Sequence, residues 1–457
     1  MRYVSTRGET PSLSFTDAVI TGLAPDGGLL IPAQIPSVAE HLEQWHGCSF
    51  VELAKGVIPL FVDDIPLPAL ERLIDEAYDC FDHDEVVPIV QVGDVAVLEL
   101  FHGPTLAFKD IALQFLGQLF EHILTARKQH LNILGATSGD TGSAAIAGVR
   151  GLPDIDIFIM YPSGRVSALQ ELQMTTVLDA NVHCLAVEGS FDDCQTLMKN
   201  LFNDLDFKQQ YCLGAINSVN WARVLAQIVY YGYASLRCAG DAPASFVVPT
   251  GNFGNVFAGY LAKRMGFPID KLVVATNENA ILTEFFNTGT YRRGEVRYTT
   301  SPAMDIQVAS NFERFLYYHL RGDVAAVRAF MAQFSETGSV TIDPPGDDDF
   351  LATAVDVADT SKTIKRVYEQ WGYVADPHTA VGLAAAERFS VPGTKVCFAT
   401  AHPAKFPETV DAAVGANLAT HPRLQALSGM PSRSTAIDAN VDAVADYIRT
   451  HSDLQNG

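Results

Sequence analysis

The chain has 457 residues, of which 48% are hydrophobic and 18% are charged, and its formal net charge is -22. This size and composition are typical of a soluble globular protein with two or three domains, and the acidic excess without any Lys and Arg cluster argues against nucleic acid as a partner. No apolar run is long enough to cross a membrane and the first residues lack the apolar core of a signal peptide, so we expect a cytoplasmic protein with no membrane partner.

The first 92 residues (1–92) are expected to form a separate N-terminal lobe, with amphipathic helices at 50–61 and 67–81. From residue 95 the pattern changes to strands that alternate with helices. The expected strands are 95–100, 131–134, 155–160, 182–187, 246–248, 271–275 and 395–399. The expected helices are 141–150, 167–177, 191–204, 219–236, 255–265, 312–319, 324–334 and 361–371. This alternation predicts an α/β fold with parallel sheets, divided into a small unit at 93–215 and a large unit at 216–457 with a cleft between them.

A helix expected from Phe108 onward carries Lys109 on its apolar face. The apolar neighbours at helical spacing are Ala112, Leu113, Leu116 and Phe120. Burial disfavours the charged form of a lysine, and a neutral lysine can condense with an aldehyde as a Schiff base. The alternative is a lysine whose stem lies on the apolar face while its ammonium group reaches water. Lys109 is therefore a candidate nucleophile only in combination with other features.

The segment ATSGDTGS (136–143) follows an expected strand and opens an expected helix. Small residues at a helix N-terminus leave backbone N–H groups free at the positive end of the helix dipole, which suits an anion such as a carboxylate. The alternative is an ordinary helix cap by Ser138, Asp140 or Thr141.

The segment TGNFGN (250–255) also joins a strand to a helix, and Gly251 and Gly254 allow backbone N–H groups to approach a phosphate closely. It matches neither the Walker A loop nor the three-glycine dinucleotide pattern, so ATP and NAD are disfavoured. The alternative is a tight turn between a strand and a helix. A third segment, TAHPAKF (400–406), places the hydroxyl of Thr400 and the cation of Lys405 just after a strand.

An aldehyde-binding lysine, a phosphate loop, a loop for a carboxylate and a hydroxyl at a sheet end describe a site for pyridoxal 5'-phosphate. The segments that carry these features resemble signature motifs of the threonine synthase family, in its bacterial and fungal branch, and they keep the order of the family. They are HGPTLAFKD (102–110), GATSGDTGSAA (135–145), NSVNWAR (217–223), GNFGN (251–255), DPHTAVG (376–382) and TAHPAKF (400–406). The resemblance extends from Ser5 to residue 410.

This resemblance implies an enzyme of the tryptophan-synthase β-subunit type, that is, the fold-type II pyridoxal-phosphate architecture with two parallel-sheet α/β units and, in this chain, an additional N-terminal helical lobe. It implies conversion of O-phospho-L-homoserine and water to L-threonine and phosphate. Lys109 is similar to the Schiff-base lysine, which would also move protons at Cα and Cβ. Thr400 matches the position whose hydroxyl faces the pyridine nitrogen. The cofactor-phosphate loop matches Gly251, Asn252, Phe253, Gly254 and Asn255.

The same resemblance implies the substrate-binding residues. The loop over the substrate carboxylate matches Thr137, Ser138, Gly139 and Thr141. Asp140 lies where many relatives have an asparagine beside the phenolic oxygen of the cofactor, so we expect it in cofactor binding with a role that departs from the fold group. The candidates for the substrate phosphate are Asn217, Asn220, Arg223 and Lys405.

Other functions would share these residues. A phospho-lyase or an amino-acid dehydratase would use the same cofactor and would differ in whether water is added at Cβ. A non-catalytic paralogue would bind the cofactor or an amino acid, but an intact Lys109 and glycine loop argue against it. The seven scattered cysteines form no Cys-x-x-Cys pair and predict neither disulfides nor a metal site. We expect a monomer or a homodimer that acts on a small molecule without a metal.

Overall fold

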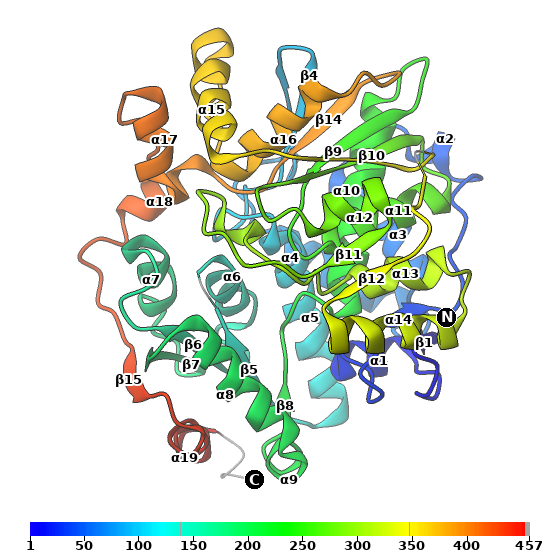
Figure 1. The fold of residues 1–457 in the computed structure, drawn as a ribbon. Helices are drawn as coiled ribbons and strands as arrows, with labels where there is room; N and C mark the ends of the chain where they lie inside the picture. The colour runs from blue at the N-terminus through cyan, green and yellow to red at the C-terminus, as the bar shows by residue number, and fades with distance from the viewer. Residues whose placement is uncertain (138, 347, 453–457) are drawn as a thin grey trace.

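The structure is a computed structural model that describes residues 1–137, 139–346 and 348–452 (Figure 1). Its larger sheet confirms the predicted alternation of parallel strands and helices, with the strand order β13-β10-β9-β14-β4-β3. Neighbouring strands in it are parallel except β3 and β4. These strands are β3 (Ile89–Val92), β4 (Val95–Glu99), β9 (Ala244–Pro249), β10 (Ile269–Thr276), β13 (Phe350–Ala354) and β14 (Lys395–Ala399).

A smaller sheet has the order β15-β7-β6-β5-β8 and is parallel throughout. Its strands are β5 (Leu131–Ala136), β6 (Ile155–Pro162), β7 (Val182–Glu188), β8 (Leu213–Gly214) and β15 (Thr435–Asp438). Every residue of β6 is buried, as expected of a central strand that helices cover on both faces. Short antiparallel pairs lie outside these sheets and are formed by β1 (Tyr3–Ser5) with β2 (Leu30–Pro32) and by β11 (Thr290–Arg292) with β12 (Ser339–Thr341).

Helices connect the strands and cover the sheets. The first are α1 (Phe15–Thr21), α2 (Leu42–Trp45), α3 (Phe50–Val57), η1 (Ile58–Leu60), α4 (Leu67–Tyr78), α5 (Lys109–Arg127) and α6 (Asp140–Val149). The next are α7 (Ala168–Thr175), α8 (Phe191–Asn203), α9 (Leu205–Gln210), α10 (Trp221–Cys238), α11 (Gly254–Met265) and α12 (Ile281–Thr288). The last are η2 (Pro302–Met304), α13 (Phe312–His319), α14 (Val324–Thr337), α15 (Val357–Trp371), α16 (Pro377–Arg388), η3 (Pro403–Lys405), α17 (Pro407–Val414), α18 (Pro422–Gln425) and α19 (Val441–His451). Among the described residues, no helix has both the length and the apolar character that a membrane span requires.

Both sheets draw strands from more than one of the units expected at 1–92, 93–215 and 216–457. Strands β3 and β4 both belong to the larger sheet, where β4 pairs in parallel with the distant β14. Strand β15, near the C-terminus, pairs with β7 in the smaller sheet, and α19 lies beside α8 (Figure 1). Parallel pairing joins strands that are far apart in the sequence, so each sheet contains strands from distant parts of the chain.

The first 92 residues form the expected helical N-terminal region, and their core is continuous with that of the rest of the chain. Phe50 of α3 stacks edge-on against Tyr78 of α4 and against Tyr233 of α10. Tyr3 of β1 contacts Trp221, whose indole N–H donates to the Tyr3 hydroxyl at 3.1 Å. The N-terminal elements therefore pack on α10, the helix whose first turns also line the cavity described below.

Helices α5 and α6 approach each other unusually closely. A Cβ on Gly117 of α5 would overlap the carbonyl oxygen of Gly148 in α6, and a Cβ on Gly148 would lie 2.5 Å from the carbonyl oxygen of Leu113. Glycine at both positions lets the two backbones touch. With the helices packed in this way, Lys109 at the start of α5 lies beside Asp140 at the start of α6.

Candidate active site

A cavity of about 870 Å³ is lined by residues of both sheets. Its walls come from the carboxyl ends of β5, β9 and β14, from the N-termini of α5, α6, α10 and α11, from α8, and from residues 302–308. Ligands of open α/β sheets bind at the carboxyl ends of strands, where loops and helix N-termini converge. The predicted loops at 136–143, 250–255 and 400–406 all contribute residues to this cavity.

Lys109 is the first residue of α5 and lies in the wall of the cavity. Its side chain is 11% exposed, and its Nζ is 3.6 Å from Oδ2 of Asp140. Burial lowers the pKa of Lys109, the positive charges of Lys405 and Arg223 lower it further, and the carboxylate of Asp140 opposes them. The predicted burial is confirmed, and the lowered pKa favours the neutral, nucleophilic amine.

Asp140 lies between two lysines. Lys405 contacts its Oδ1 at 3.1 Å, and the amide of Gln170 donates to the same oxygen at 2.9 Å. Burial raises the pKa of the Asp140 carboxyl, but the positive charges of Lys405 and Lys109 outweigh burial and hold this pKa below its usual range. Asp140 therefore stays ionised and carries a negative charge beside the Lys109 amine.

Lys405 does not line the cavity, contrary to its prediction as a substrate ligand. Its side chain is fully buried, and its Nζ donates to the carbonyl oxygen of Thr105 at 2.8 Å and to Oε1 of Gln173 at 2.9 Å. Together with Asp140 these acceptors use the three donors of an ammonium group. Lys405 therefore holds Asp140 from behind and has no donor left for a substrate.

The loop before Lys109 is fixed by a buried carboxylate. Asp110 accepts from the backbone N–H of Thr105 at 2.8 Å and from the Thr105 hydroxyl at 2.7 Å. Ala107 forms an isolated antiparallel bridge with Ala401, and the N–H of Phe108 donates to the carbonyl oxygen of Thr400 at 2.8 Å. This bridge holds the residues after β14 against the start of α5.

Thr400 lines the cavity at the end of β14 and is 7% exposed. Its hydroxyl has no hydrogen-bond partner among the described residues, although its carbonyl oxygen is held by Phe108. A hydroxyl that is nearly buried and unpaired is available to a polar ligand atom in the cavity.

The loop at 250–255 ends in the N-terminus of α11. Phe253 adopts a left-handed conformation with φ 64°, and α11 starts at Gly254 without a side-chain cap. The first N–H groups of a helix have no intrahelical partner, so this uncapped terminus can bind an anion. A Cβ at Gly251 would lie 2.5 Å from the carbonyl oxygen of Ala303, and one at Gly254 would lie 3.1 Å from the amide nitrogen of Asn311. Glycine is therefore required more strictly at Gly251 than at Gly254.

Two buried donors in the cavity wall lack partners in the described part of the chain. One is Nε of Arg223, a residue 4% exposed whose Nη1 donates to the carbonyl oxygen of Ile216 at 3.4 Å. Burial lowers the pKa of Arg223 to about 10, which leaves it cationic at neutral pH. The other is Nδ2 of Asn255, whose Oδ1 accepts from the Tyr230 hydroxyl at 2.7 Å. Unpaired buried donors are costly, so the cavity is built for a ligand rich in acceptor atoms.

The structure brings Asn217 but not Asn220 to the cavity. Asn217 lines it and is exposed, and its Oδ1 accepts from the N–H of Val219 at 3.3 Å. Asn220 is fully buried, donates to the carbonyl oxygen of Val19 at 2.8 Å and caps α10 through the N–H of Ala222 at 3.1 Å. Asn220 therefore positions the start of α10 and has no atom free for a substrate.

In the loop at 137–141, Ser138 lies outside the described residues. The hydroxyl of Thr137 accepts from the N–H groups of Gly139 at 3.0 Å and Gly142 at 2.9 Å, so it orders the loop itself. Gly139 has φ 146° and precedes α6, and Thr137 caps the N–H of Gly142 in the first turn of this helix. Asp140 and Thr141 lie inside the first turn of α6 and line the cavity, and no described residue accepts a hydrogen bond from their N–H groups.

Several residues that line the cavity were not predicted from the sequence. Helix α8 presents Asp192, Gln195 and Lys199 to the cavity, and residues 302–308 close another side. His378 donates from its Nδ1 to Asp376 at 2.8 Å and accepts from the N–H of Ala303 at 3.2 Å. The segment DPHTAVG was recognised as a motif, but nothing local in it predicts that its histidine meets residue 303. The amphipathic pattern of α8 likewise carries no indication of the cavity.

Family models match most of the chain. They are described as threonine synthase N terminus for residues 2–78, pyridoxal-phosphate dependent enzyme for residues 88–346 and threonine synthase, C-terminal, for residues 379–448. The pyridoxal-phosphate dependent enzyme model alone spans more than half of the chain.

Similar proteins cover nearly the whole chain. Threonine synthase of Schizosaccharomyces pombe is 45% identical over 90% of this chain and 89% of its own length, and that of Pseudomonas aeruginosa is 44% identical over 99% and 98%. The crystal structure of pyridoxal-phosphate-bound threonine synthase from Brucella melitensis is 47% identical, covers 99% of this chain and 100% of its own, and superposes with a TM-score of 0.96. The fold-type II architecture is thereby confirmed, and the chain belongs to the threonine synthase family of pyridoxal-phosphate-dependent enzymes.

Proposed function

We infer that the chain converts O-phospho-L-homoserine and water to L-threonine and phosphate with pyridoxal phosphate. The observation that carries this inference is the convergence in one cavity of a buried, pKa-lowered lysine, an uncapped helix N-terminus and unpaired buried donors, in a chain of the threonine synthase family. The unpaired donors fit a cofactor and a substrate that both carry phosphate oxygens. The cofactor, when bound, supplies the conjugated system that lets protons leave Cα and Cβ and phosphate leave Cγ.

We propose that Lys109 attaches the cofactor aldehyde and then moves protons at Cα and Cβ. Its amine lies in the cavity wall, 3.6 Å from Asp140, and burial favours the neutral form. Once protonated, the amine gains the carboxylate of Asp140 at 3.6 Å as a counter-charge. Such a pair allows one group to accept a proton and return it without leaving the cavity.

We propose that the cofactor phosphate binds at the N-terminus of α11. The free N–H groups of Gly251, Asn252, Phe253, Gly254 and Asn255 would surround it. This arrangement suits a chain of net charge -22, because backbone donors and a helix dipole bind phosphate without a lysine. The unpaired hydroxyl of Thr400 would face the ring nitrogen, and as a neutral group it would not hold a proton there as a carboxylate does.

We propose that the substrate anions bind on opposite sides of Lys109. The open N-terminus of α6, with the N–H groups of Asp140 and Thr141, would take the carboxylate. Arg223 would take the phosphate that leaves Cγ, because its guanidinium is cationic, buried and only partly paired. Asn217 is the remaining neutral donor at that wall.

We further propose a cytoplasmic monomer or homodimer. All cysteines that the structure describes are free, with Cys80 and Cys212 exposed, which suits a reducing compartment. The acidic surface charge keeps such a protein soluble. Sedimentation of the holoenzyme would distinguish the two oligomeric states.

The products formed from O-phospho-L-homoserine test the reaction. We expect the purified holoenzyme to release phosphate and threonine in equal amounts, with oxygen from labelled water in the threonine hydroxyl. Phosphate accompanied by 2-oxobutyrate would instead identify a phospho-lyase, and absence of phosphate release would reject both. The Lys109→Ala variant should be inactive, and borohydride treatment of the wild type should leave the pyridoxyl group on Lys109, with Lys405 unmodified as an internal control.

A further inference from the structure

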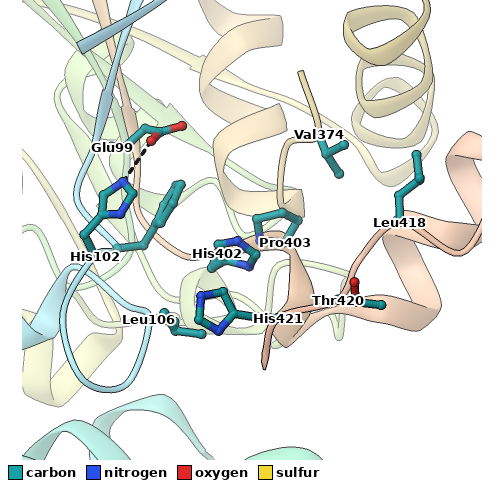
Figure 2. Close-up of a pocket in the computed structure, with 10 residues that line it drawn as sticks. Glu99, His102, Leu106, Val374, His402, Pro403, Leu418, Thr420 and His421 are labelled. Carbon is teal, nitrogen blue, oxygen red and sulfur yellow. Dashed lines mark hydrogen bonds and ion pairs between the residues drawn. The ribbon is translucent and has the colours of Figure 1, made fainter. Parts of the chain in front are cut away.

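A second cavity, of about 350 Å³, is lined by Leu106 and His402, which are close in sequence to Lys109 and Thr400 (Figure 2). None of its described lining residues belongs to the first cavity. It contains His102 and His402, which the motifs HGPTLAFKD and TAHPAKF bring together but which the proposed reaction does not use. Its volume is at the lower end of the roughly 300–1,000 Å³ range of small-molecule sites.

Two imidazoles present N–H donors in this cavity. Nδ1 of His402 accepts from the N–H of Ala404 at 3.1 Å, and Nδ1 of His421 accepts from the N–H of Arg423 at 3.2 Å. Each ring in its neutral form therefore carries its proton on Nε2. No described residue accepts a hydrogen bond from either Nε2, and the two rings lie 4.8 Å apart.

The neutral form prevails near pH 7. Burial and the neighbouring His421 lower the pKa of His402 to about 4, although Glu99 and Asp376 oppose them. Burial also lowers the pKa of His421, with Asp82 opposing this shift and Arg423 adding to it. The surroundings of both imidazoles disfavour protonation, so only an anion bound beside the two rings would stabilise their protonated forms.

The rest of the wall supplies one negative charge and an apolar surface. The carboxylate of Glu99 accepts from Nε2 of His102 at 2.9 Å. Figure 2 shows Glu99 and His102 on one side of the cavity and the side chains of Val374 and Leu418 on the other. A ligand that fits this wall needs a cation for Glu99, an anion for the imidazole donors and an apolar part.

We propose that this cavity binds a small apolar α-amino acid in its zwitterionic form. The ammonium group lies at Glu99, the carboxylate accepts from Nε2 of His402 and His421, and the side chain contacts Val374 and Leu418. A carboxylate that accepts from an ammonium group and two neutral N–H donors that bind a carboxylate together recognise a zwitterion and discriminate against a simple amine or a simple acid.

Occupancy of this site is transmitted to the first cavity through a shared piece of backbone. The side chains of Leu106 and His402 both line the second cavity. The N–H of His402 donates to the carbonyl oxygen of Leu106 at 3.0 Å, next to the Ala107–Ala401 bridge. Phe108, two residues after Leu106, and Thr400, two residues before His402, line the first cavity. A ligand that shifts His402 therefore shifts the loop that positions Thr400 and Lys109.

Calorimetric titration of the holoenzyme with N,N-dimethyl-L-valine tests the site. This probe is a zwitterion with an apolar side chain, but its tertiary amine cannot condense with an aldehyde, so its binding is measured without turnover and independently of the proposed reaction. We expect saturable binding that Glu99→Gln and His421→Gln each weaken at least about tenfold, since each removes a charge-assisted contact. His46→Gln, which changes an exposed histidine far along the chain, should leave binding unchanged.

Each other outcome rejects part of the proposal. Absence of binding to the wild type, or binding that survives both substitutions, rejects the site. Equal binding of N,N-dimethyl-L-valinol, which lacks the carboxylate, rejects a zwitterion as the ligand class. An unchanged cofactor absorbance spectrum at saturation with the probe rejects transmission to Lys109 and Thr400.

Discussion

Lys109 shares its surroundings with three other charges, and their signs determine how readily its amine loses a proton. Lys405 and Lys109 contact opposite oxygens of Asp140, at 3.1 and 3.6 Å. Lys405 acts on Lys109 directly, as a like charge that lowers its pKa, and Asp140 acts in the opposite direction. A residue with no access to the cavity can therefore adjust the nucleophile inside it.

Opposite shifts in the pKa of Lys109 are expected from removing its two charged neighbours. Lys405→Met removes a positive charge and should raise the pKa, so that cofactor attaches to the apoprotein more slowly at neutral pH. Asp140→Asn removes a negative charge and should lower the pKa, so that the rate profile moves to lower pH. The measurement is the pH dependence of the rate of cofactor incorporation. Shifts of the same sign in both variants would contradict the arrangement.

Arg223 gives a second test at the scale of single residues. Arg223→Gln should retain the cofactor but lose about 100-fold in kcat/KM toward O-phospho-L-homoserine, because the departing phosphate loses a charged donor. Inorganic phosphate should also inhibit the variant less than the wild type. Arg237→Gln on the exposed end of the same helix is the matched control and should retain full activity. An Arg223 variant of normal activity would place the phosphate elsewhere.

At the scale of elements, the strands that carry the site were predictable because each is a short apolar run followed by turn residues. The prediction for 395–399 coincides with β14, and helix 312–319 coincides with α13. Strand β13 was not predicted, since FLATA follows an acidic loop and becomes a strand by pairing with β10, far away in the sequence. Helix α16 was not predicted either, although Asp376 caps it and Pro377 opens it.

The candidate site shows the same division between local and long-range information. Loops that join a strand to a helix N-terminus could be recognised, and the cavity contains residues from all of them. The placement of Asn220 and Lys405 could not be predicted, because it depends on hydrogen bonds to the carbonyl oxygens of Val19 and Thr105, which are 201 and 300 residues away. Sequence spacing predicts which element a side chain is on, and distant partners decide what remains free.

The N-terminus of α11 offers a test of an element rather than a residue. Gly251→Ala should weaken cofactor affinity by about tenfold or more, because the new Cβ meets the carbonyl oxygen of Ala303 and the loop must move. Gly254→Ala should have a smaller effect, since its Cβ meets the amide of Asn311. Gly240→Ala, where a Cβ meets nothing within 4 Å, is the control. Equal affinity in all three variants, measured by cofactor titration, would exclude the loop as the phosphate site.

At the scale of the whole molecule, Arg314 joins parts of the chain that are far apart. It is fully buried and donates to the carbonyl oxygen of Leu30 at 2.9 and 3.1 Å and to that of Val219 at 2.5 Å. It also donates to Oδ1 of Asn311, whose amide reaches the carbonyl oxygen of Asn252 at 3.2 Å. One side chain thus connects β2, the start of α10 and the loop before α11.

Arg314→Met should therefore affect both stability and the cofactor. The substitution leaves buried acceptors on Leu30, Val219 and Asn311 without donors, and the expected loss in the free energy of unfolding is about 2 to 4 kcal/mol after the relief of burying a charge is counted. Cofactor affinity should fall as well, because the Asn311 amide is no longer held against the carbonyl oxygen of Asn252 and only the backbone N–H of Asn311, at 3.0 Å, still holds the loop there.

Chemical denaturation and cofactor titration of the same samples provide the measurement for Arg314. Arg72→Met in α4 is the control, since Arg72 is exposed and pairs with Glu76 four residues on, and its loss should cost less than about 1 kcal/mol. A normal cofactor affinity in a destabilised Arg314→Met protein would mean that the junction supports the fold alone. Normal stability would mean that Leu30, Val219 and Asn311 find other donors, and the junction would then not connect the N-terminal elements to the site.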